Sequence, residues 1–344
     1  MSSSSALVEN TIRRHLAKHE IWQHLAQDSP EIQGAVEHAL LARGKRLRPR
    51  LFMLTAAGYG MQSEQITQQV SLALELAHAF VLLHDDLIDK ASSRRGIPTI
   101  GRELDARWSA APARSFTGND AALILGDLLY TLAIEALLQT GAAAEKGAAA
   151  VRMLAGAAQM TARGALREIV AARTDPAQLS MAQLYQTYRL KTAFYTFQLP
   201  MQLGALFADR ADTSMAAIQA FAGEAGLAFQ LCNDYKPLQA WLTGGELPDD
   251  IREGRVTAAL LHVWENTTAT ERNSLMGGNS QTVHRLFLDC DVLDWLAREI
   301  EHLIAQAKAL IAPLGLSQSA AASLHQLLDT MPCSVVEDKT APGA

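Results

Sequence analysis

Apolar residues recur at steps of three and four through most of this chain, and this spacing constrains the fold more than any other feature. Leu72, Leu76, Phe80, Leu83 and Leu87 would lie along one side of a helix. Alternating apolar and polar residues, or Asn-Gly and Asp-Gly turns between apolar runs, would indicate strands and hairpins, and we find neither. The pattern predicts an all-α fold, with further helices over residues 121–138, 149–171, 181–207 and 215–232.

The chain shows no division into separate domains. Its composition does not change along its length, and no internal repeat is visible. Apolar residues make up 49% of the sequence, enough for a large core and too many for an intrinsically disordered protein. We therefore expect one domain over residues 6–335, with flexible tails at residues 1–5 and 336–344.

Charge and cysteine content restrict the partners and the compartment. The 30 Lys and Arg residues are outnumbered by 36 Asp and Glu residues, which argues against a nucleic-acid partner bound by general electrostatic attraction. The three cysteines are odd in number and widely spaced, so they form neither a disulfide framework nor a metal-ligand pattern. Residues 1–20 have no apolar core of the signal-peptide type, and polar residues and a proline interrupt the longest uncharged stretch, residues 192–208. We expect a soluble, cytoplasmic protein without a transmembrane segment.

Three aspartates lie within five residues at the end of an apolar helical stretch. Asp85 and Asp89 are four residues apart and would project from one face of the helix, with Asp86 beside them and His78 on nearly the same stripe. Such carboxylates repel one another beside a core unless a cation neutralises them. Two of them suit Mg²⁺, which prefers oxygen ligands and is usually shared with substrate phosphates. For the motif alone, an exposed acidic helix end is the simpler explanation.

Two basic segments flank this acidic cluster in the sequence. Residues 43–50 contain five cations in eight residues, and residues 92–99 place Arg94 and Arg95 beside a glycine and proline turn. A charge run by itself is usually a solvated surface. A guanidinium group, however, can bind two phosphate oxygens at once. Basic segments on both sides of a carboxylate cluster therefore indicate a metal–diphosphate site.

The order and spacing of these motifs resemble the trans-isoprenyl diphosphate synthases, also called polyprenyl synthetases. The sequence has Gly-Lys-Arg-x-Arg-Pro, then His-Asp-Asp-x-x-Asp, then Arg-Arg-Gly-x-Pro-Thr, with weaker matches as far as residue 262. The resemblance implies an isoprenoid-synthase-type helical bundle around a deep central pocket. It also implies a homodimer and a Mg²⁺-dependent condensation of isopentenyl diphosphate with an allylic diphosphate.

The resemblance assigns roles to individual residues. Isopentenyl diphosphate would be held by Lys45, Arg48, His78 and Arg95. The residues near the allylic diphosphate would be Arg94, Lys191, Thr192 and Gln230, and Arg255 keeps the charge of a family lysine. The Mg²⁺ ligands would be Asp85 and Asp89, with Asp86 close by and Asp234 in a second motif. The catalytic set is Asp85, Asp89, Arg94 and Lys191. Outside this pattern, His78 would be read as a core histidine and Lys191 as a solvent-facing lysine.

The second aspartate-rich motif of the family is incomplete here. Asn233 and Pro237 stand where the family has aspartates, and only Asp234 remains. Asparagine can still offer Mg²⁺ a neutral oxygen, whereas proline offers none and continues a helix poorly. Lys236 adds a cation where the metal should bind. The resemblance therefore implies an intact first metal site and a weakened second one.

Three functions remain open because of this incomplete motif. The first is a chain-elongating synthase with reduced or altered activity, which the retained acceptor-diphosphate residues favour. The second is a divergent prenyltransferase or terpene cyclase with another acceptor, since Asn233-Asp234 begins a class I cyclase triad that Pro237 and Trp241 do not complete. The third is a low-activity partner subunit that forms a heteromer with an active homologue.

Product length is the last inference from the resemblance. In this family the pocket floor lies under the residues four and five before the first aspartate, here Val81 and Phe80. A bulky Phe80 would block a long tail, which favours a farnesyl or geranylgeranyl product. The spacing equally allows Phe80 to pack on the core face of its helix.

Overall fold

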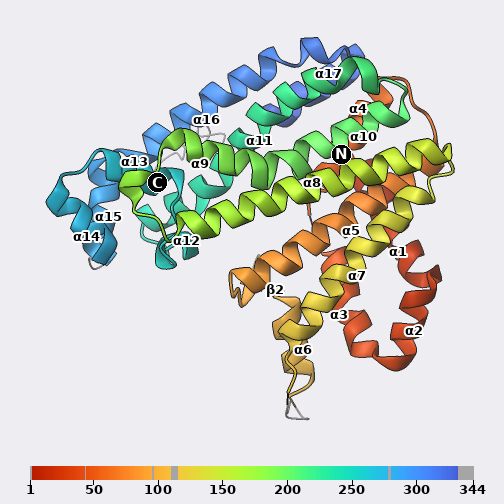
Figure 1. The fold of residues 1–344 in the computed structure, drawn as a ribbon, viewed down its shortest axis with the longest axis horizontal. Helices are drawn as coiled ribbons and strands as arrows, with labels where there is room; N and C mark the ends of the chain where they lie inside the picture. The colour runs from red at the N-terminus through yellow and green to blue at the C-terminus, as the bar shows by residue number, and fades with distance from the viewer. Residues whose placement is uncertain (1, 43, 95–96, 110–114, 278–279, 332–344) are drawn as a thin grey trace, which may run out of the picture. The chain divides into compact units, whose positions relative to one another are not determined.

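The computed structural model describes residues 2–42, 44–94, 97–109, 115–277 and 280–331, and these are almost entirely helical (Figure 1). The predicted all-α fold is confirmed. The exception in the described part of the chain is a hairpin of two short antiparallel strands, β1 (Ser93–Arg94) and β2 (Ile97–Pro98). Arg95 lies between these strands and outside the described residues, as does the third cysteine, Cys333.

Contacts divide the chain into two compact units. Unit 1 is Met1–Ala56 with Gly60–Arg152, and unit 2 is Ala57–Tyr59 with Met153–Ala344. The single domain over residues 6–335 stays a prediction. Residues 2–5, which we expected to be a flexible tail, belong to the first helix. Residues 336–344 lie outside the described part of the chain.

Unit 1 is built around two long helices that pack along each other, α5 (Glu64–Ile88) and α7 (Gly118–Leu138). The predicted stripe on α5 is buried at Leu72, Leu76 and Leu83. Both helices begin at side-chain caps: Ser63 accepts from the backbone N–H of Ile66, and Thr117 and Asp120 form a capping box. The other helices of the unit are α1 (Ser2–Lys18), α2 (Glu20–Asp28), α3 (Pro30–Leu41), α4 (Leu47–Gly58), α6 (Ile100–Arg107) and the start of α8 (Ala144–Ala171).

Unit 2 is organised around α11 (Ala211–Leu242), which packs against α16 (Val292–Ala309) and a π-helical segment, η2 (Arg189–Gln198). The helix predicted over residues 181–207 is therefore three consecutive segments, α9 (Met181–Tyr188), η2 and α10 (Leu199–Phe207). The shorter elements of the unit are η1 (Pro176–Gln178), α12 (Asp249–Arg252), α13 (Ala258–Glu265), α14 (Ala269–Gly277), α15 (Ser280–Asp289), η3 (Ala312–Leu314) and α17 (Gln318–Asp329).

Helix α11 continues through Pro237 to Leu242, beyond the helix predicted over residues 215–232. Proline inside a helix costs about 3 kcal/mol. Beyond Pro237, Leu238 and Trp241 are buried, and the Trp241 ring packs edge-on against Phe287 at 5.5 Å. Burial of large apolar side chains, at roughly 1.5–3 kcal/mol each, offsets the proline.

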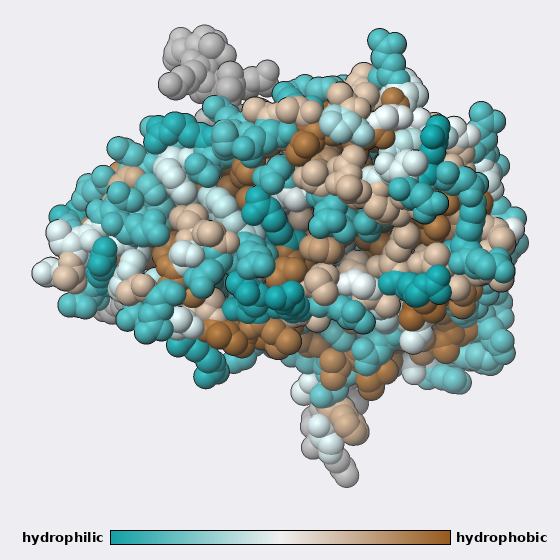
Figure 2. Space-filling model, turned by 45° about the horizontal axis from the view of Figure 1, so that its top comes forward, coloured by the Kyte–Doolittle hydropathy of each residue, from teal (hydrophilic) through white to brown (hydrophobic). Residues whose placement is uncertain are grey.

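By length and composition alone, three helices could cross a membrane: α5, α7 and α11. In each, about half of the most apolar window is buried inside the protein, 56%, 44% and 50% respectively. On the face drawn in Figure 2, hydrophobic residues lie among hydrophilic ones. The burial indicates that these helices are apolar because they form the core.

Candidate active site

The three predicted metal-binding aspartates lie at the C-terminal end of α5. Asp85 and Asp86 are in its last turn, and Asp89 caps the helix by donating its backbone N–H to the Asp85 carbonyl at 2.8 Å. The C-terminal end of a helix carries partial negative charge, which disfavours carboxylates there. The cluster therefore needs a cation from elsewhere.

Arg94 on β1 supplies positive charge to this cluster. Its Nε donates to Asp86 Oδ1 at 2.7 Å, and its Nη2 lies 3.2 Å from Asp85 Oδ2. Burial raises the pKa of the Asp86 carboxyl, and the Arg94 guanidinium opposes that rise. Burial by itself would lower the pKa of Arg94, but the two carboxylates outweigh it and raise that pKa. We had placed Arg94 beside the allylic diphosphate; here it binds the aspartates.

The basic segment before α4 contains one residue with a structural role. Arg46 forms an ion pair with Glu75 of α5, and these side chains are only 9% and 5% exposed. Arg46 also donates to the carbonyl oxygens of Leu40 at 2.8 Å and Ala42 at 3.2 Å. Its φ of 45° lies in the left-handed region, which the buried ion pair offsets. Arg46 thus ties this loop to α5.

The predicted isopentenyl diphosphate residues lie on either side of that anchor. Lys45 is exposed in the loop, Arg48 is buried in the first turn of α4, and His78 is half-buried on α5. Arg95 is outside the described residues. The role of these residues stays a prediction.

Phe80 lies in an aromatic layer between α5 and α7. Its ring centroid is 4.7 Å from that of His84 and 4.9 Å from that of Tyr130. The side chain is half-buried. It therefore packs between helices, while its role in setting product length stays a prediction.

In unit 2, Lys191 lies on η2 and its Nζ is 2.5 Å from Glu168 Oε2 on α8. Gly164, one turn earlier on α8, allows this approach, because a Cβ atom there would come 2.5 Å from the Lys191 backbone nitrogen. Sequence reasoning missed Glu168.

Arg255, which follows α12, contacts two carboxylates. Its Nη2 lies 2.7 Å from Glu253 Oε2, and its Nη1 lies 3.6 Å from Asp250 Oδ1.

Three of the predicted residues in unit 2 are joined in one hydrogen-bonded chain. Thr192 Oγ1 donates to Gln230 Oε1 at 2.7 Å, and Gln230 Nε2 donates to Asp234 Oδ1 at 2.8 Å. Tyr188, which sequence reasoning missed, donates its hydroxyl to Asp234 Oδ2 at 2.7 Å. Burial, reinforced by the charges of Asp250 and Glu168, raises the pKa of Asp234 to about 7. The only signal for Tyr188 is its spacing of four residues before Thr192.

Within the described ranges, no group of three or more His, Cys, Asp or Glu side chains could hold a metal ion. Such a cage is not what Mg²⁺ requires, because it typically takes one or two carboxylates together with substrate phosphates and water. That Asp85 and Asp89 hold Mg²⁺ stays a prediction, as does a metal role for Asp234. In the second motif, Asp234 accepts hydrogen bonds at both oxygens, Pro237 offers no ligand, and Asn233 and Lys236 are exposed.

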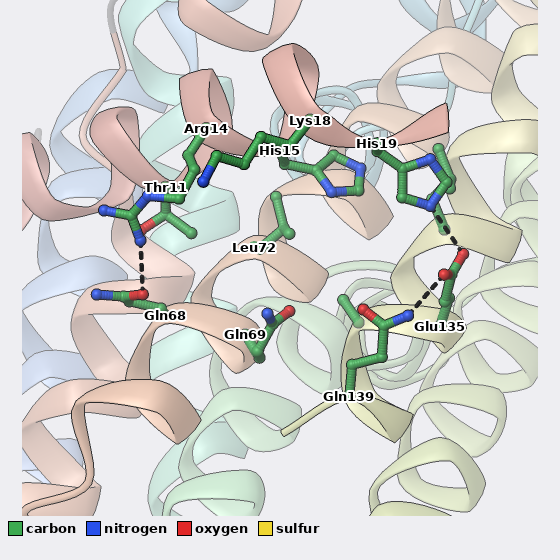
Figure 3. Close-up of a pocket in the computed structure, with 12 residues that line it drawn as sticks. Thr11, Arg14, His15, Lys18, His19, Gln68, Gln69, Leu72, Glu135 and Gln139 are labelled. Carbon is green, nitrogen blue, oxygen red and sulfur yellow. Dashed lines mark hydrogen bonds and ion pairs between the residues drawn. The ribbon is translucent and has the colours of Figure 1, made fainter. Parts of the chain in front are cut away.

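Each unit also contains a cavity that none of the predicted site residues lines. The cavity of unit 1 has about 270 Å³ between α1, α5 and α7, with His15 and His19 on one side and Glu135 on the other (Figure 3). The cavity of unit 2 has about 640 Å³ and a largely apolar lining from α8, α9, and Thr174 and Leu179 between them. Sequence analysis predicted neither cavity. The walls of the first come from three separate stretches of the chain, whereas those of the second come from the single stretch 159–187.

The all-helical fold, with an aspartate cluster at the end of a long helix and an arginine bound to it, agrees with the fold that the sequence resemblance implies. The polyprenyl synthetase family model matches residues 29–286, most of the chain, and the chain belongs to that family. The resemblance stated from the sequence is confirmed.

Several relatives carry similar sequences. The geranylfarnesyl diphosphate synthase of Aeropyrum pernix is 24% identical over 308 residues, which cover 86% of this chain and 92% of that protein. Component 2 of the heptaprenyl diphosphate synthase of Geobacillus stearothermophilus is 31% identical over 234 residues, covering 66% of this chain and 65% of that protein. A solved geranylgeranyl pyrophosphate synthase from Corynebacterium glutamicum, complexed with isoprenyl diphosphate and magnesium, has a TM-score of 0.84 at 23% identity and covers 95% of this chain and 97% of its own. That likeness shows the fold.

Proposed function

We propose that the protein condenses isopentenyl diphosphate with an allylic diphosphate, in the presence of Mg²⁺, to give a short- or medium-chain prenyl diphosphate such as farnesyl or geranylgeranyl diphosphate. One observation carries the proposal: three carboxylates gather at the negative end of α5, where only positive charge can stabilise them. The names of the relatives, among them a geranylgeranyl diphosphate synthase of Sulfolobus acidocaldarius that is 25% identical over 293 residues, support the choice of substrates.

Asp85 and Asp89 would hold Mg²⁺, with Asp86 beside them. The metal would supply positive charge where the leaving diphosphate becomes more negative. Arg94 is placed to neutralise the aspartates before substrate arrives, and its guanidinium can bind phosphate oxygens in pairs afterwards.

Cationic and polar side chains would bind and orient the two substrates. We assign isopentenyl diphosphate to Lys45, Arg48, His78 and Arg95. The allylic diphosphate is assigned to Arg94, Lys191, Thr192, Gln230 and Arg255. Fixing both reactants in one orientation removes much of the entropic barrier, and an apolar surrounding keeps water away from the allylic cation.

The decisive experiment incubates the purified chain with Mg²⁺, labelled isopentenyl diphosphate and each allylic primer in turn. We expect elongated prenyl diphosphates. Asp85→Asn and Asp89→Asn should each abolish them, whereas Asp28→Asn, which changes an exposed aspartate at the end of another helix, α2, should not. Release of a hydrocarbon or alcohol instead would identify a cyclase and overturn the proposal.

The second candidate function is a low-activity partner subunit of an active homologue. Two observations favour it: the relative from Geobacillus stearothermophilus is named as one component of a synthase, and the second motif keeps only one of its aspartates, Asp234. In the same assay such a subunit would be silent alone, and would change the rate or product length of an added homologue.

We also infer a homodimer and a cytoplasmic location. In the single chain, Leu123 and Ile124 on α7 are 49% and 69% exposed. Large apolar residues exposed in this way are typical of a surface that a second copy covers in a dimer. In unit 2, α8 exposes Leu166 and Val170. Light scattering should give twice the monomer mass, and Ile124→Lys should reduce it. Fractionated cells should contain the protein in the supernatant, since the apolar helices are half-buried in the core.

A further inference from the structure

Tyr188 connects three elements of unit 2 through one hydroxyl group. It is the last residue of α9 and its side chain is buried. The hydroxyl donates to Asp234 Oδ2 on α11 at 2.7 Å and accepts from the backbone N–H of Ala258, the first residue of α13, at 3.2 Å. A phenol in this position has both its donor and an acceptor site in use.

The remaining bonds continue from Asp234 toward η2. Asp234 Oδ1 accepts from Gln230 Nε2, and Gln230 Oε1 accepts from Thr192 Oγ1. Each polar group in this series of hydrogen bonds has a partner of the correct type, so the orientation of each side chain fixes that of the next one. The amide nitrogen of Gln230 retains a second N–H that the chain does not use.

These contacts give Asp234 a different role from a metal ligand. Both of its oxygens accept from donors within the protein, and the other positions of the motif, Asn233, Lys236 and Pro237, carry no carboxylate. As a magnesium ligand, Asp234 would need one of those oxygens turned toward the ion, which substrate phosphates would also bind.

We propose that Asp234 does not bind metal in this chain, and that Tyr188 acts through it as a positioning residue that orients Gln230 and Thr192 toward the allylic diphosphate. The inference rests on the proposed function for the identity of that substrate. The sequence change that removed the second metal site thus left an aspartate that holds substrate-binding side chains in place.

The test compares two tyrosines of α9 that each donate to a carboxylate. Tyr188→Phe removes the hydroxyl of the chain described above. Tyr185→Phe is the matched control, because Tyr185 donates to Glu299 Oε2 at 3.0 Å, outside that chain. We expect Tyr188→Phe to raise the KM for the allylic diphosphate roughly ten- to a hundred-fold, the effect of losing one hydrogen bond to a charged group, with a smaller change in kcat. Tyr185→Phe should leave KM unchanged.

Two further measurements keep the outcome decisive. In titrations with Mn²⁺ alone, monitored by electron paramagnetic resonance, Asp234→Asn should bind the ion as tightly as the unchanged protein does. Asp85→Asn should bind it less tightly. Inorganic pyrophosphate titrated by calorimetry should bind Tyr188→Phe more weakly than Tyr185→Phe. Weaker Mn²⁺ binding by Asp234→Asn, or equal pyrophosphate binding by the two tyrosine variants, would overturn the proposal.

These binding measurements also separate this inference from the proposed function. If the unchanged protein forms no prenyl diphosphate, the proposed function fails, while the Mn²⁺ and pyrophosphate titrations still decide the role of Tyr188. Thermal unfolding of both tyrosine variants should show similar losses of stability. A KM effect confined to Tyr188→Phe then reflects the orientation of Gln230 and Thr192.

Discussion

The guanidinium group of Arg94 holds the carboxylate of Asp86 through two nitrogens, with Nε at 2.7 Å and Nη2 at 2.6 Å from Oδ1. The positive charge of Arg94 therefore neutralises part of the negative charge that a divalent ion would neutralise at the end of α5. A cation that enters this cluster has to compete with it.

That competition predicts an unusual effect of removing a positive charge. Arg94→Gln should tighten the binding of Mn²⁺ or Mg²⁺ measured without substrate by about two- to five-fold, the equivalent of a partly exposed ion pair. The same variant should bind the allylic diphosphate more weakly. Arg107→Gln, which breaks an exposed pair with Glu103 on α6, is the control and should change neither quantity. Weaker metal binding by Arg94→Gln would contradict the prediction.

The ion pair of Arg46 with Glu75 should be a major determinant of stability. Glu75→Gln leaves a buried guanidinium without its counter-charge, and we expect the free energy of unfolding in urea to fall by about 3–5 kcal/mol. Arg46→Met combined with Glu75→Leu should lose less than either single change, because no buried charge remains. Breaking the exposed pair of Arg252 with Asp249 should cost under about 1 kcal/mol. Equal losses for the buried and exposed pairs would show that burial does not matter here.

Phe80→Ala should lengthen the products. The substitution removes the ring that packs against Tyr130, and we expect chains at least one isoprene unit longer in the product analysis. Tyr130→Phe keeps the aromatic layer and should leave the product spectrum unchanged. If Phe80→Ala lowers the unfolding temperature but yields the same products, Phe80 only packs between the helices.

Stability should depend on pH through His15 (Figure 3). Burial, together with the charge of the neighbouring His19, lowers the pKa of this imidazole to about 4, although Glu135 opposes the shift. Between pH 6.5 and about 4 the unfolded chain binds the proton and the folded chain does not. The contribution of neutral His15 to the free energy of unfolding is therefore fully present above pH 6.5. It falls as the pH drops, by at most about 1.4 kcal/mol per pH unit. Urea unfolding at pH 7 and pH 5 should show this loss, and His15→Gln should reduce it, unlike His24→Gln at an exposed position.

The sequence predicted those features that depend on local spacing. Buried Leu72, Leu76 and Leu83 follow the predicted stripe, and Asp85 and Asp89 end the same helix, because helical periodicity determines both. The partners of buried polar groups could not be predicted in this way. Arg46 finds Glu75 29 residues away, and Tyr188 finds Asp234 46 residues away, so no local pattern links them. The continuation of α11 through Pro237 could not be predicted either, because the cost of the proline is local, whereas the packing that offsets it is tertiary.

The π-helical segment has a consequence for how this chain can change. Its wider winding accommodates more residues per turn than an α-helix does. A residue inserted or deleted there is taken up by a change between the two kinds of winding, so that α9 before it and α10 after it keep their faces. Evolution can therefore change the length of the segment that carries Lys191 and Thr192 without turning its neighbours.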